Sequence, residues 1–465
     1  MLKYHIVYER TKKGLFNMKT SDTKRRIYIL VVSGISLIVQ TISCGIVWYQ
    51  YYNPLIRIPF WTKGHWYILT LYCFILIFFT HIYGGFKIGH LKKWDSLFSQ
   101  VFASICSNIV FYAEIALLAY YFPTPLPLLG TALFDIIFII VWIQITTDIY
   151  RRLFPPHKIC LIYGEGLELE ARNKLTERKD KFFVKVSICS NAPQRELEQV
   201  IIKSETEAVL FWGVPNLVRN DLLKFCYENH IRIYTLPCIA DILLSGAEVM
   251  HFFDTPLLLL RSTPLSIDQR ALKRIIDIVL ALIVLILTSP IMIITALCIK
   301  LYDHGPILYT QTRCTQNGRE FRICKFRSMK TDAEKNGQPK LAAKNDDRIT
   351  PVGHVIRKVR IDELPQLFNI IRGDMSFVGP RPERPEIIAE YQDKLPEFYY
   401  RMHVKAGLTG YAQIYGKYNT TLYDKLKLDL YYVEHYSLWL DFKLLILTTK
   451  IIFSPESTEG VENAD

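Results

Sequence analysis

Four apolar segments in the first third of the chain constrain its fold more than any other feature. They lie at about residues 27–49, 66–86, 97–121 and 129–149. Each is close to the ~20 residues that an α-helix needs to cross the hydrocarbon core of a bilayer. Buried helices of a large soluble protein are the alternative interpretation. Four such runs in succession, with Trp48, Trp61 and Trp66 near their ends, favour transmembrane helices with aromatic residues at the interfaces.

Basic residues orient these segments. Residues 1–26 are polar and end in Lys24-Arg25-Arg26, and Arg151-Arg152 follow the fourth segment. Because cytoplasmic loops of membrane proteins carry an excess of Lys and Arg, we expect residues 1–26 to be a cytoplasmic basic N-terminus. We expect the chain after Arg152 to be cytoplasmic as well. The first apolar run is too long for the apolar region of a cleavable signal peptide, and further apolar runs follow it.

Charge and cysteine usage narrow the class of partner. The net charge of +12 suits an anionic membrane surface or phosphorylated ligands. We expect no nucleic acid, because the sequence contains neither a Lys/Arg-rich recognition helix nor an aromatic RNA-binding motif. The ten cysteines show no CxxC spacing, which indicates reduced thiols and cytosol-facing domains.

Residues 153–262 change character and alternate between apolar strands and charged helices. KICLIYGEG reads as a strand that ends in a glycine turn, and ELEARNKLTERKD reads as the helix that follows. The alternation continues to about residue 236, which predicts a small open α/β sheet of Rossmann type. Gly164 and Gly166 begin a GxGxxG pattern, but its third glycine position is Leu169. An incomplete motif is weak support for a nucleotide, so we expect a structural or regulatory module, with nucleotide binding as the alternative.

Residues 263–302 contain a fifth apolar run that decides the architecture. It begins after Lys273-Arg274, ends at Lys300 and is long enough to span a bilayer. Ser289-Pro290 interrupts it in the middle, where proline deletes a backbone hydrogen bond and produces a bend. A straight span would place all that follows outside the cytoplasm. We therefore expect a re-entrant membrane helix whose basic flanks stay on one face, where they can reach lipid headgroups.

Residues 357–382, RKVRIDELPQLFNIIRGDMSFVGPRP, concentrate charge in a chain of fixed turns. The acidic pair Asp362-Glu363 lies among cations, which are Arg357, Lys358, Arg360, Arg372 and Arg381. Arginine binds phosphate oxygens bidentately, and a carboxylate can hold a divalent metal ion or act as a nucleophile. The alternative is that the two acids simply cap a helix N-terminus.

The whole stretch resembles the signature of the bacterial polyprenyl-phosphate sugar-1-phosphate transferases, the large monotopic phosphoglycosyltransferases that start exopolysaccharide or O-antigen assembly on a lipid carrier. Residues 302–453 resemble the catalytic domain of that family throughout. The family's re-entrant helix is similar too, with a Lys-Arg entry, an acid one turn later at Asp277 and a Ser-Pro break. The chain departs from the pattern at three positions, which are Thr315, Ala406 and Lys417, where the family often has glycine, proline and arginine.

The resemblance implies a two-step transfer that needs Mg²⁺. Asp362, also a candidate metal ligand, would attack the sugar-linked phosphate of a UDP-sugar and release UMP. Polyprenyl (undecaprenyl) phosphate would then attack the phosphosugar-aspartate and form a polyprenyl-diphosphate-sugar. Glu363 would orient its neighbour or tune the metal, with acid/base work as the alternative. The candidate phosphate-binding cations are Lys325, Arg327, Arg381 and Lys417. Asp429 and Asp441 match carboxylates of the family pattern, and structural pairing with Arg or Lys is as well supported as a substrate role.

The expected fold class is a membrane protein with four N-terminal transmembrane helices, a Rossmann-like α/β module, and a re-entrant membrane helix followed by a small α/β catalytic domain. The expected parts are residues 1–26, 27–152, 153–262, 263–302 and 303–455, with a disordered tail at 456–465. The expected location is the bacterial inner membrane, multi-pass, with the catalytic domain facing the cytoplasm. The spans and the Rossmann-like module offer surfaces for a homodimer. Two alternatives are a polytopic transferase with its site between full spans, and a non-catalytic membrane scaffold or regulator.

Overall fold

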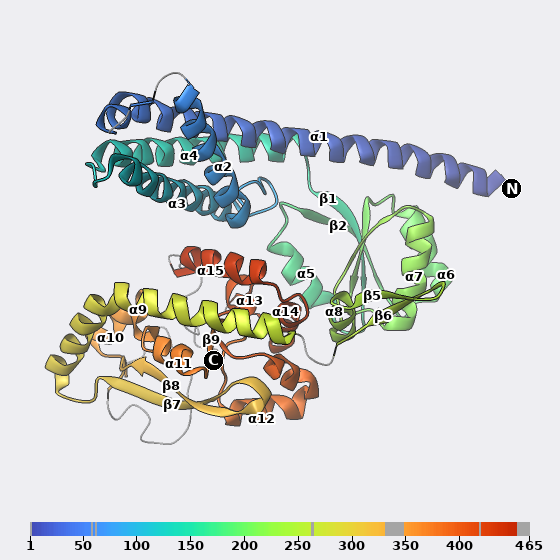
Figure 1. The fold of residues 1–465 in the computed structure, drawn as a ribbon. Helices are drawn as coiled ribbons and strands as arrows, with labels where there is room; N and C mark the ends of the chain where they lie inside the picture. The colour runs from blue at the N-terminus through green and yellow to red at the C-terminus, as the bar shows by residue number, and fades with distance from the viewer. Residues whose placement is uncertain are drawn as a thin grey trace. The chain divides into compact units, whose positions relative to one another are not determined.

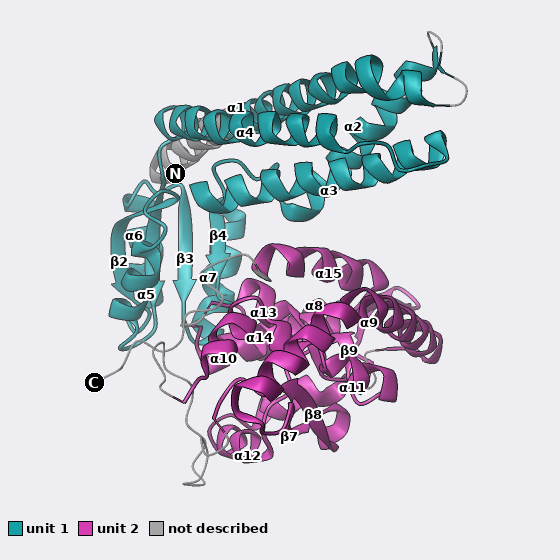
Figure 2. Ribbon diagram, turned by 90° about the vertical axis from the view of Figure 1, so that its left-hand side faces the viewer, with its two compact units in different colours: residues 1–236 teal, residues 237–465 magenta. Residues whose placement is uncertain are grey.

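The computed structural model describes residues 2–56, 59–60, 63–261, 265–330, 348–417 and 420–452, with side chains from Asp22 onward. The chain divides into two units, residues 1–236 and residues 237–465 (Figure 2). The expected disordered tail lies outside the described residues.

The first unit begins with four long helices (Figure 1). They are α1 (Leu2–Val47), α2 (Lys63–Tyr83), α3 (Lys93–Ala119) and α4 (Leu126–Leu153). Successive helices pack against one another, and α1 also packs against α4. Between α1 and α2 the chain forms a π-helical turn (Trp48–Tyr52) and a 3-10 turn (Asn53–Leu55). Among the described residues, five helices are long and apolar enough to cross a membrane, and these four are among them. The long apolar helices confirm the expected membrane protein.

A parallel four-stranded sheet completes the first unit. Its strands are β1 (His157–Tyr163), β2 (Phe182–Cys189), β3 (Ala208–Trp212) and β4 (Arg232–Thr235), in the order β2-β1-β3-β4. The helices α5 (Glu168–Thr176), α6 (Gln194–Lys203) and α7 (Asn216–Glu228) connect them. The expected alternation of strand and helix is therefore present. Leu167 lies against Gly213 at the carboxyl ends of β1 and β3, where a Rossmann fold would bind a nucleotide.

The second unit starts earlier than the sequence analysis placed it. Helix α8 (Ile239–Ser245) and the hairpin β5 (Glu248–Phe252) and β6 (Thr255–Leu259) follow β4, in residues that we assigned to the Rossmann-like module. Ile239 and Ile242 are buried with Phe398, Leu426 and Leu430 of the second unit. This apolar contact between segments distant in sequence moves the division to residues 236 and 237.

Helix α9 (Ile267–Asp303) is the fifth long apolar helix, and it changes direction along its length (Figure 1). Ser266 caps its N-terminus in a capping box with Gln269. Pro290 cannot donate to the Ile286 carbonyl, and the Ser289 hydroxyl donates to that carbonyl instead at 2.8 Å. The serine thus supplies the hydrogen bond that the proline removes, which explains how a Ser-Pro pair is accommodated inside a continuous apolar helix.

The remainder of the second unit is a small α/β fold on one side of α9. The antiparallel pair β7 (Leu308–Cys314) and β8 (Glu320–Phe326) comes first. Then follow α10 (Pro351–Lys358), a 3-10 turn (Ile361–Glu363), α11 (Gln366–Arg372), β9 (Ser376–Val378), α12 (Pro385–Lys394) and a longer 3-10 segment (Pro396–His403). The chain continues with β10 (Gly407–Thr409), which pairs with β9 in parallel, and ends in α13 (Tyr411–Tyr415), α14 (Leu422–Glu434) and α15 (Leu438–Ile452).

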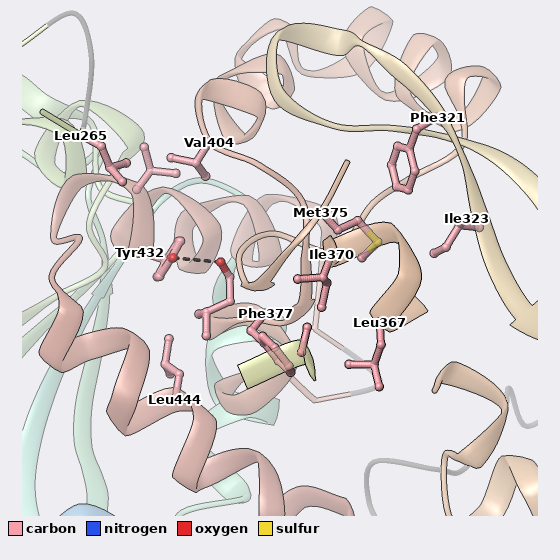
Figure 3. Close-up of a cluster of buried hydrophobic side chains, with 13 residues drawn as sticks. Leu265, Phe321, Ile323, Leu367, Ile370, Met375, Phe377, Val404, Tyr432 and Leu444 are labelled. Carbon is pink, nitrogen blue, oxygen red and sulfur yellow. Dashed lines mark hydrogen bonds between the residues drawn. The ribbon is translucent and has the colours of Figure 1, made fainter. Parts of the chain in front are cut away.

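One apolar cluster holds these elements together (Figure 3). It includes Leu367 and Ile370 of α11, Phe377 of β9, Tyr432 of α14 and Leu444 of α15. Ala281 of α9 is fully buried in the same cluster. The N-terminal half of α9 is therefore part of the core that carries the acidic pair.

Candidate active site

A strained turn presents the acidic pair. Arg360 has φ 56°, in the left-handed region, directly before the 3-10 turn that holds Asp362 and Glu363. A side chain in this region costs on the order of 1–2 kcal/mol, which the surrounding packing must offset. The Glu363 amide donates to the Arg360 carbonyl at 3.2 Å, which closes the turn. The N-cap of α11 is Pro365, and the Glu363 carboxylate binds Lys325 and Arg381, so the contacts favour a charged site over the helix-capping interpretation.

Glu363 is bound by two cations. Lys325 at the end of β8 donates to its carboxylate at 3.0 Å, and Arg381 donates to the same oxygen at 3.2 Å. Its side chain is 14% exposed, against 45% for that of Arg381. Burial opposes ionisation of Glu363, but Lys325 and Arg381 outweigh it and hold the pKa of this carboxyl well below its ordinary value. Glu363 is therefore a permanent anion that keeps two cations side by side.

The pKa of Asp362 is shifted in the opposite direction to that of Glu363. Burial raises the pKa of Asp362 to about 6, and the neighbouring charge of Glu363 adds to this shift. Lys325, Arg357 and Arg381 offset part of the increase. Among the described residues no ion pair within 4 Å is formed by Asp362, whereas Glu363 forms two. A carboxylate that is partly desolvated and not bound by a cation is the more nucleophilic of the two.

Arg381 is carried by a loop with a closely held backbone. The amide of Gly379 donates to the Thr409 carbonyl at 2.9 Å, and the Gly407 amide donates to the Pro380 carbonyl at 2.9 Å. A Cβ at Gly379 would collide with the backbone of Lys405, so this position requires glycine. The loop thus fixes where the Arg381 side chain starts, while its guanidinium stays accessible.

The other predicted phosphate ligands are placed differently. Arg327 is buried, and it pairs with Asp303 at the end of α9. Lys417 is exposed after α13, where its backbone amide donates to the Thr420 hydroxyl at 2.7 Å. Lys325 and Arg381 are therefore the predicted cations that the structure brings to the acidic pair.

Asp429 and Asp441 lie behind the site, where each pairs with a buried cation. Asp429 binds Arg401 at 2.7 Å, and Asp441 binds Lys273 at 2.5 Å. The side chains of all four residues are at most 12% exposed. These contacts favour the structural pairing that the sequence left open for both carboxylates.

The start of α9 is bound to protein groups. Lys273 donates to the Val378 carbonyl at 3.1 Å, and Arg274 donates to the carbonyls of Ile370 and Ile371 at the C-terminal end of α11. Asp277 accepts from the Phe377 amide at 3.1 Å. We expected Lys273 and Arg274 to reach lipid headgroups, and this expectation needs correction. The carbonyl end of α11 attracts the Arg274 cation, while Lys273 is held by the Val378 carbonyl and Asp441.

A divalent metal ion would have to share its ligands with the substrate. Among the described residues no group of three or more His, Cys, Asp or Glu side chains could hold a metal ion. Mg²⁺ commonly binds through one or two carboxylates together with substrate phosphates and water. Glu363 is already bound by Lys325 and Arg381, so Asp362 is the carboxylate of the pair that fits this mode.

Two residues that no sequence pattern indicated also bind the loop that carries Arg381. Arg401 donates to the Arg381 carbonyl at 2.9 Å, and the Tyr432 hydroxyl donates to the Val378 carbonyl at 3.1 Å. Both act on the backbone of the Arg381 loop from elements that follow it in the sequence. No spacing rule signals such contacts, because the partners meet only in the folded chain.

Known proteins share the second unit. A family model described as bacterial sugar transferase matches residues 268–455. The UDP-N-acetylgalactosamine-undecaprenyl-phosphate N-acetylgalactosaminephosphotransferase of Aeromonas hydrophila is 38% identical over 267 residues, which are 55% of this chain and 62% of that protein. The UDP-glucose:undecaprenyl-phosphate glucose-1-phosphate transferase of Escherichia coli (strain K12) is 39% identical over 213 residues, 45% of each chain.

The protein of the same name from Caulobacter vibrioides is 38% identical over 197 residues, which are 41% of this chain and 73% of that protein. The chain thus spans about half the length of the first two relatives and almost three quarters of the third.

Proposed function

Because the chain belongs to the bacterial sugar transferase family, we propose that it transfers a sugar 1-phosphate from a UDP-sugar to undecaprenyl phosphate. The relatives' names support both substrates, since they specify undecaprenyl phosphate as acceptor and UDP-glucose or UDP-N-acetylgalactosamine as donor. The observation that carries the proposal is the contrast within the acidic pair. Glu363 is held by Lys325 and Arg381, while Asp362 beside it is left without such a partner.

In this proposal Asp362 is the nucleophile. One of its oxygens attacks the phosphorus that carries the sugar, the bond to the bridging oxygen of the diphosphate breaks, and UMP leaves with the electron pair. An oxygen of undecaprenyl phosphate then attacks the same phosphorus and releases the Asp362 carboxylate. Dividing the transfer into two displacements lets one site serve donor and acceptor in turn. Neither step requires a strong general base, because both attacking groups are already ionised.

The cations offset the repulsion between these anions. Donor and acceptor both carry phosphate, and the nucleophile is a third negative group, so charge stabilisation is the main requirement of catalysis. Glu363 holds Lys325 and Arg381 together, with N–H groups left over for the donor phosphates. Mg²⁺ bound by Asp362 and the diphosphate would neutralise further charge.

We further propose that α9 enters and leaves the membrane on the face that carries the catalytic unit. Lys273 and Arg274 at its start contact β9 and α11. Near its end, Ile299 packs against Phe326 and Ile356 of β8 and α10. Because α11 and β8 are joined directly through Asn369, both ends of α9 touch one folded body.

The middle of α9 has the surface that such an insertion requires. Ile286 and Leu287, before the bend, are each 71% exposed, and Ile293 and Ile294, after it, are each 61% exposed. Exposed aliphatic side chains before and after the bend indicate a membrane contact in a protein of this class. The basic residues before the first apolar segment and after the fourth favour the cytoplasmic face of the bacterial inner membrane.

The test is UMP release from UDP-glucose or UDP-N-acetylgalactosamine by full-length protein in lipid nanodiscs with Mg²⁺ and undecaprenyl phosphate. Short incubation without acceptor, followed by peptide mass analysis, should find a phosphosugar on the peptide that contains Asp362. Asp362→Asn should release no UMP, and Glu390→Gln, which removes an exposed carboxylate on α12, should release it at the wild-type rate. An adduct on another residue, or turnover by Asp362→Asn, would refute the assignment. No release from any UDP-sugar would favour the scaffold alternative.

A further inference from the structure

The loop that carries Arg381 is held from two sides by the same arrangement of groups. On one side, Asp441 of α15 accepts from Lys273 of α9, and Lys273 donates to the Val378 carbonyl at 3.1 Å. On the other side, Asp429 of α14 accepts from Arg401, and Arg401 donates to the Arg381 carbonyl at 2.9 Å. In each case a buried carboxylate holds a buried cation, and the cation holds a carbonyl at one end of the loop.

Tyr432 strengthens the first of these connections. Its single hydroxyl proton is shared between the Asp441 carboxylate at 2.8 Å and the Val378 carbonyl at 3.1 Å. Figure 3 shows the second of these contacts as a dashed line. The ring is 1% exposed in the apolar cluster of the second unit, so the hydroxyl has little freedom. The Val378 carbonyl therefore receives two donors that share one carboxylate.

Asp277 holds the strand that precedes the loop. It accepts from the Ser376 hydroxyl at 3.0 Å and from the Phe377 amide at 3.1 Å. Together with Lys273 it lies in the first three turns of α9, close to the point where the helix begins its apolar run. The position of α9 and the position of the loop are therefore not independent.

From these contacts we propose that Asp441 and Asp429 are positioning residues. They act through Lys273 and Arg401 to fix the 378–381 backbone, so that the Arg381 guanidinium meets Glu363 and faces the donor. This inference rests on the proposed function, because it gives Arg381 the task of binding donor phosphate. It also means that α9, the helix proposed to enter the membrane, contacts the loop that carries Arg381 through Lys273.

The physical reason is the cost of an unpaired buried charge. Lys273 and Arg401 are 12% and 8% exposed at the side chain, so loss of the carboxylate would leave each with a poorly compensated buried charge. Arg401 would keep only its longer contact with Glu383, at 3.8 Å. Without Asp441, Lys273 would turn toward solvent and release the Val378 carbonyl. The loop would then gain conformations in which Arg381 and Glu363 are separated, and donor binding would have to select the productive one.

The kinetic test is a double-mutant cycle with Arg381→Ala on the first half-reaction. Asp441→Asn and Asp429→Asn should each raise the donor KM about tenfold, with a smaller change in the rate of adduct formation at saturation. In the Arg381→Ala background each should change kcat/KM less than about twofold, because the residue they position is gone. Substitution of a residue that merely supports folding would lower the amount of active protein and leave KM unchanged. Its effect on kcat/KM would then multiply with the effect of Arg381→Ala.

A second measurement needs no activity. Hydrogen exchange at the amides of Phe377, Val378, Gly379 and Arg381 should speed up about tenfold or more in Asp441→Asn and Asp429→Asn. If these carboxylate variants do not fold, Tyr432→Phe should show the same increase. Glu390→Gln, which breaks the exposed pair with Lys394, should leave these amides unchanged. Unchanged exchange, or multiplicative kinetics, would overturn the inference while the proposed function stands. A wild-type protein that forms no adduct would instead overturn the proposed function.

Discussion

Replacing Asp362 by asparagine should abolish transfer and at the same time make the second unit more stable at pH 8. Burial raises the pKa of Asp362 from 3.8 to about 6. At about 1.4 kcal/mol per pH unit, this difference corresponds to about 3 kcal/mol. The charged carboxylate is the form that the folded site disfavours. Asparagine keeps the shape of the side chain and never carries that charge.

The stability contribution of Asp362 depends on pH because the folded state binds its proton more tightly than the unfolded state does. The folded pKa lies above the unfolded one, so the stabilising contribution of this group is complete below about pH 4 and is lost as the pH rises through about 6. The free energy of unfolding of Asp362→Asn should therefore exceed that of wild type by about 3 kcal/mol at pH 8 and by about half of that at pH 5. For a unit of this size about 1 kcal/mol moves the melting midpoint by about 2–4 °C.

The assay is thermal unfolding of the full chain in detergent with EDTA, followed by intrinsic fluorescence at pH 5, 6.5 and 8. The melting midpoint of Asp362→Asn should exceed that of wild type by several degrees at pH 8, and the gap should narrow steadily toward pH 5. Glu390→Gln serves as the matched control, since this carboxylate of the same unit is 60% exposed at the side chain. A gap that is absent at pH 8, or equal at pH 5 and pH 8, would refute the burial argument.

Four further outcomes are expected. The rate of adduct formation should rise about tenfold per pH unit below about pH 6 and level off above it, because the nucleophile must be ionised; a flat profile from pH 5 to 8 would exclude Asp362. Arg381→Lys should raise the donor KM more than it lowers the rate at saturation, since lysine keeps the charge and loses the fork. Cysteines at Ile267 and Leu301, in a background without accessible thiols, should both resist an impermeant reagent in intact cells, and labelling of Leu301→Cys alone would indicate a true span. A chain that starts at Pro237 should keep transferase activity in lipid, and a folded but inactive product would implicate the first unit in the site.

The features that could be predicted from the sequence are those set by local pattern. Apolar runs of about 20 residues and strand-helix alternation depend on neighbouring residues, so the long helices and the parallel sheet of the first unit were recognisable. The bend in α9 was predictable for the same reason, because Ser289-Pro290 acts on its own turn. The division between the units was misplaced, because it depends on where Ile239 and Ile242 pack. Their partners Phe398, Leu426 and Leu430 lie about 160 to 190 residues further along the chain.

The sequence indicated which charged residues make up the site, but it did not indicate which cation pairs with which carboxylate. Asp362, Glu363 and the cations around them stand out in one stretch of sequence. Which cation binds which carboxylate depends on contacts between residues that are far apart: Lys325 lies 38 positions from Glu363, and Lys273 lies 168 positions from Asp441. Arg327 and Lys325 are two positions apart, yet one pairs with Asp303 and the other with Glu363. Their different partners depend on the folded position of the end of β8, which the number of charges in the sequence does not indicate.

These pairings explain why one carboxylate of several can act as a nucleophile. Asp429 and Asp441 are each bound by a buried cation that also holds the Arg381 loop, and Glu363 is bound by two cations at the site itself. A carboxylate in such a pair is a poor nucleophile, since attack would leave the cations uncompensated in a partly desolvated place. Asp362 has the same chemistry and a different environment: its surroundings oppose its charge, and in the proposed reaction the acyl-phosphate bond would remove the charge from this carboxyl group. The three bound carboxylates hold the cations of the site, and the fourth, Asp362, is the proposed nucleophile.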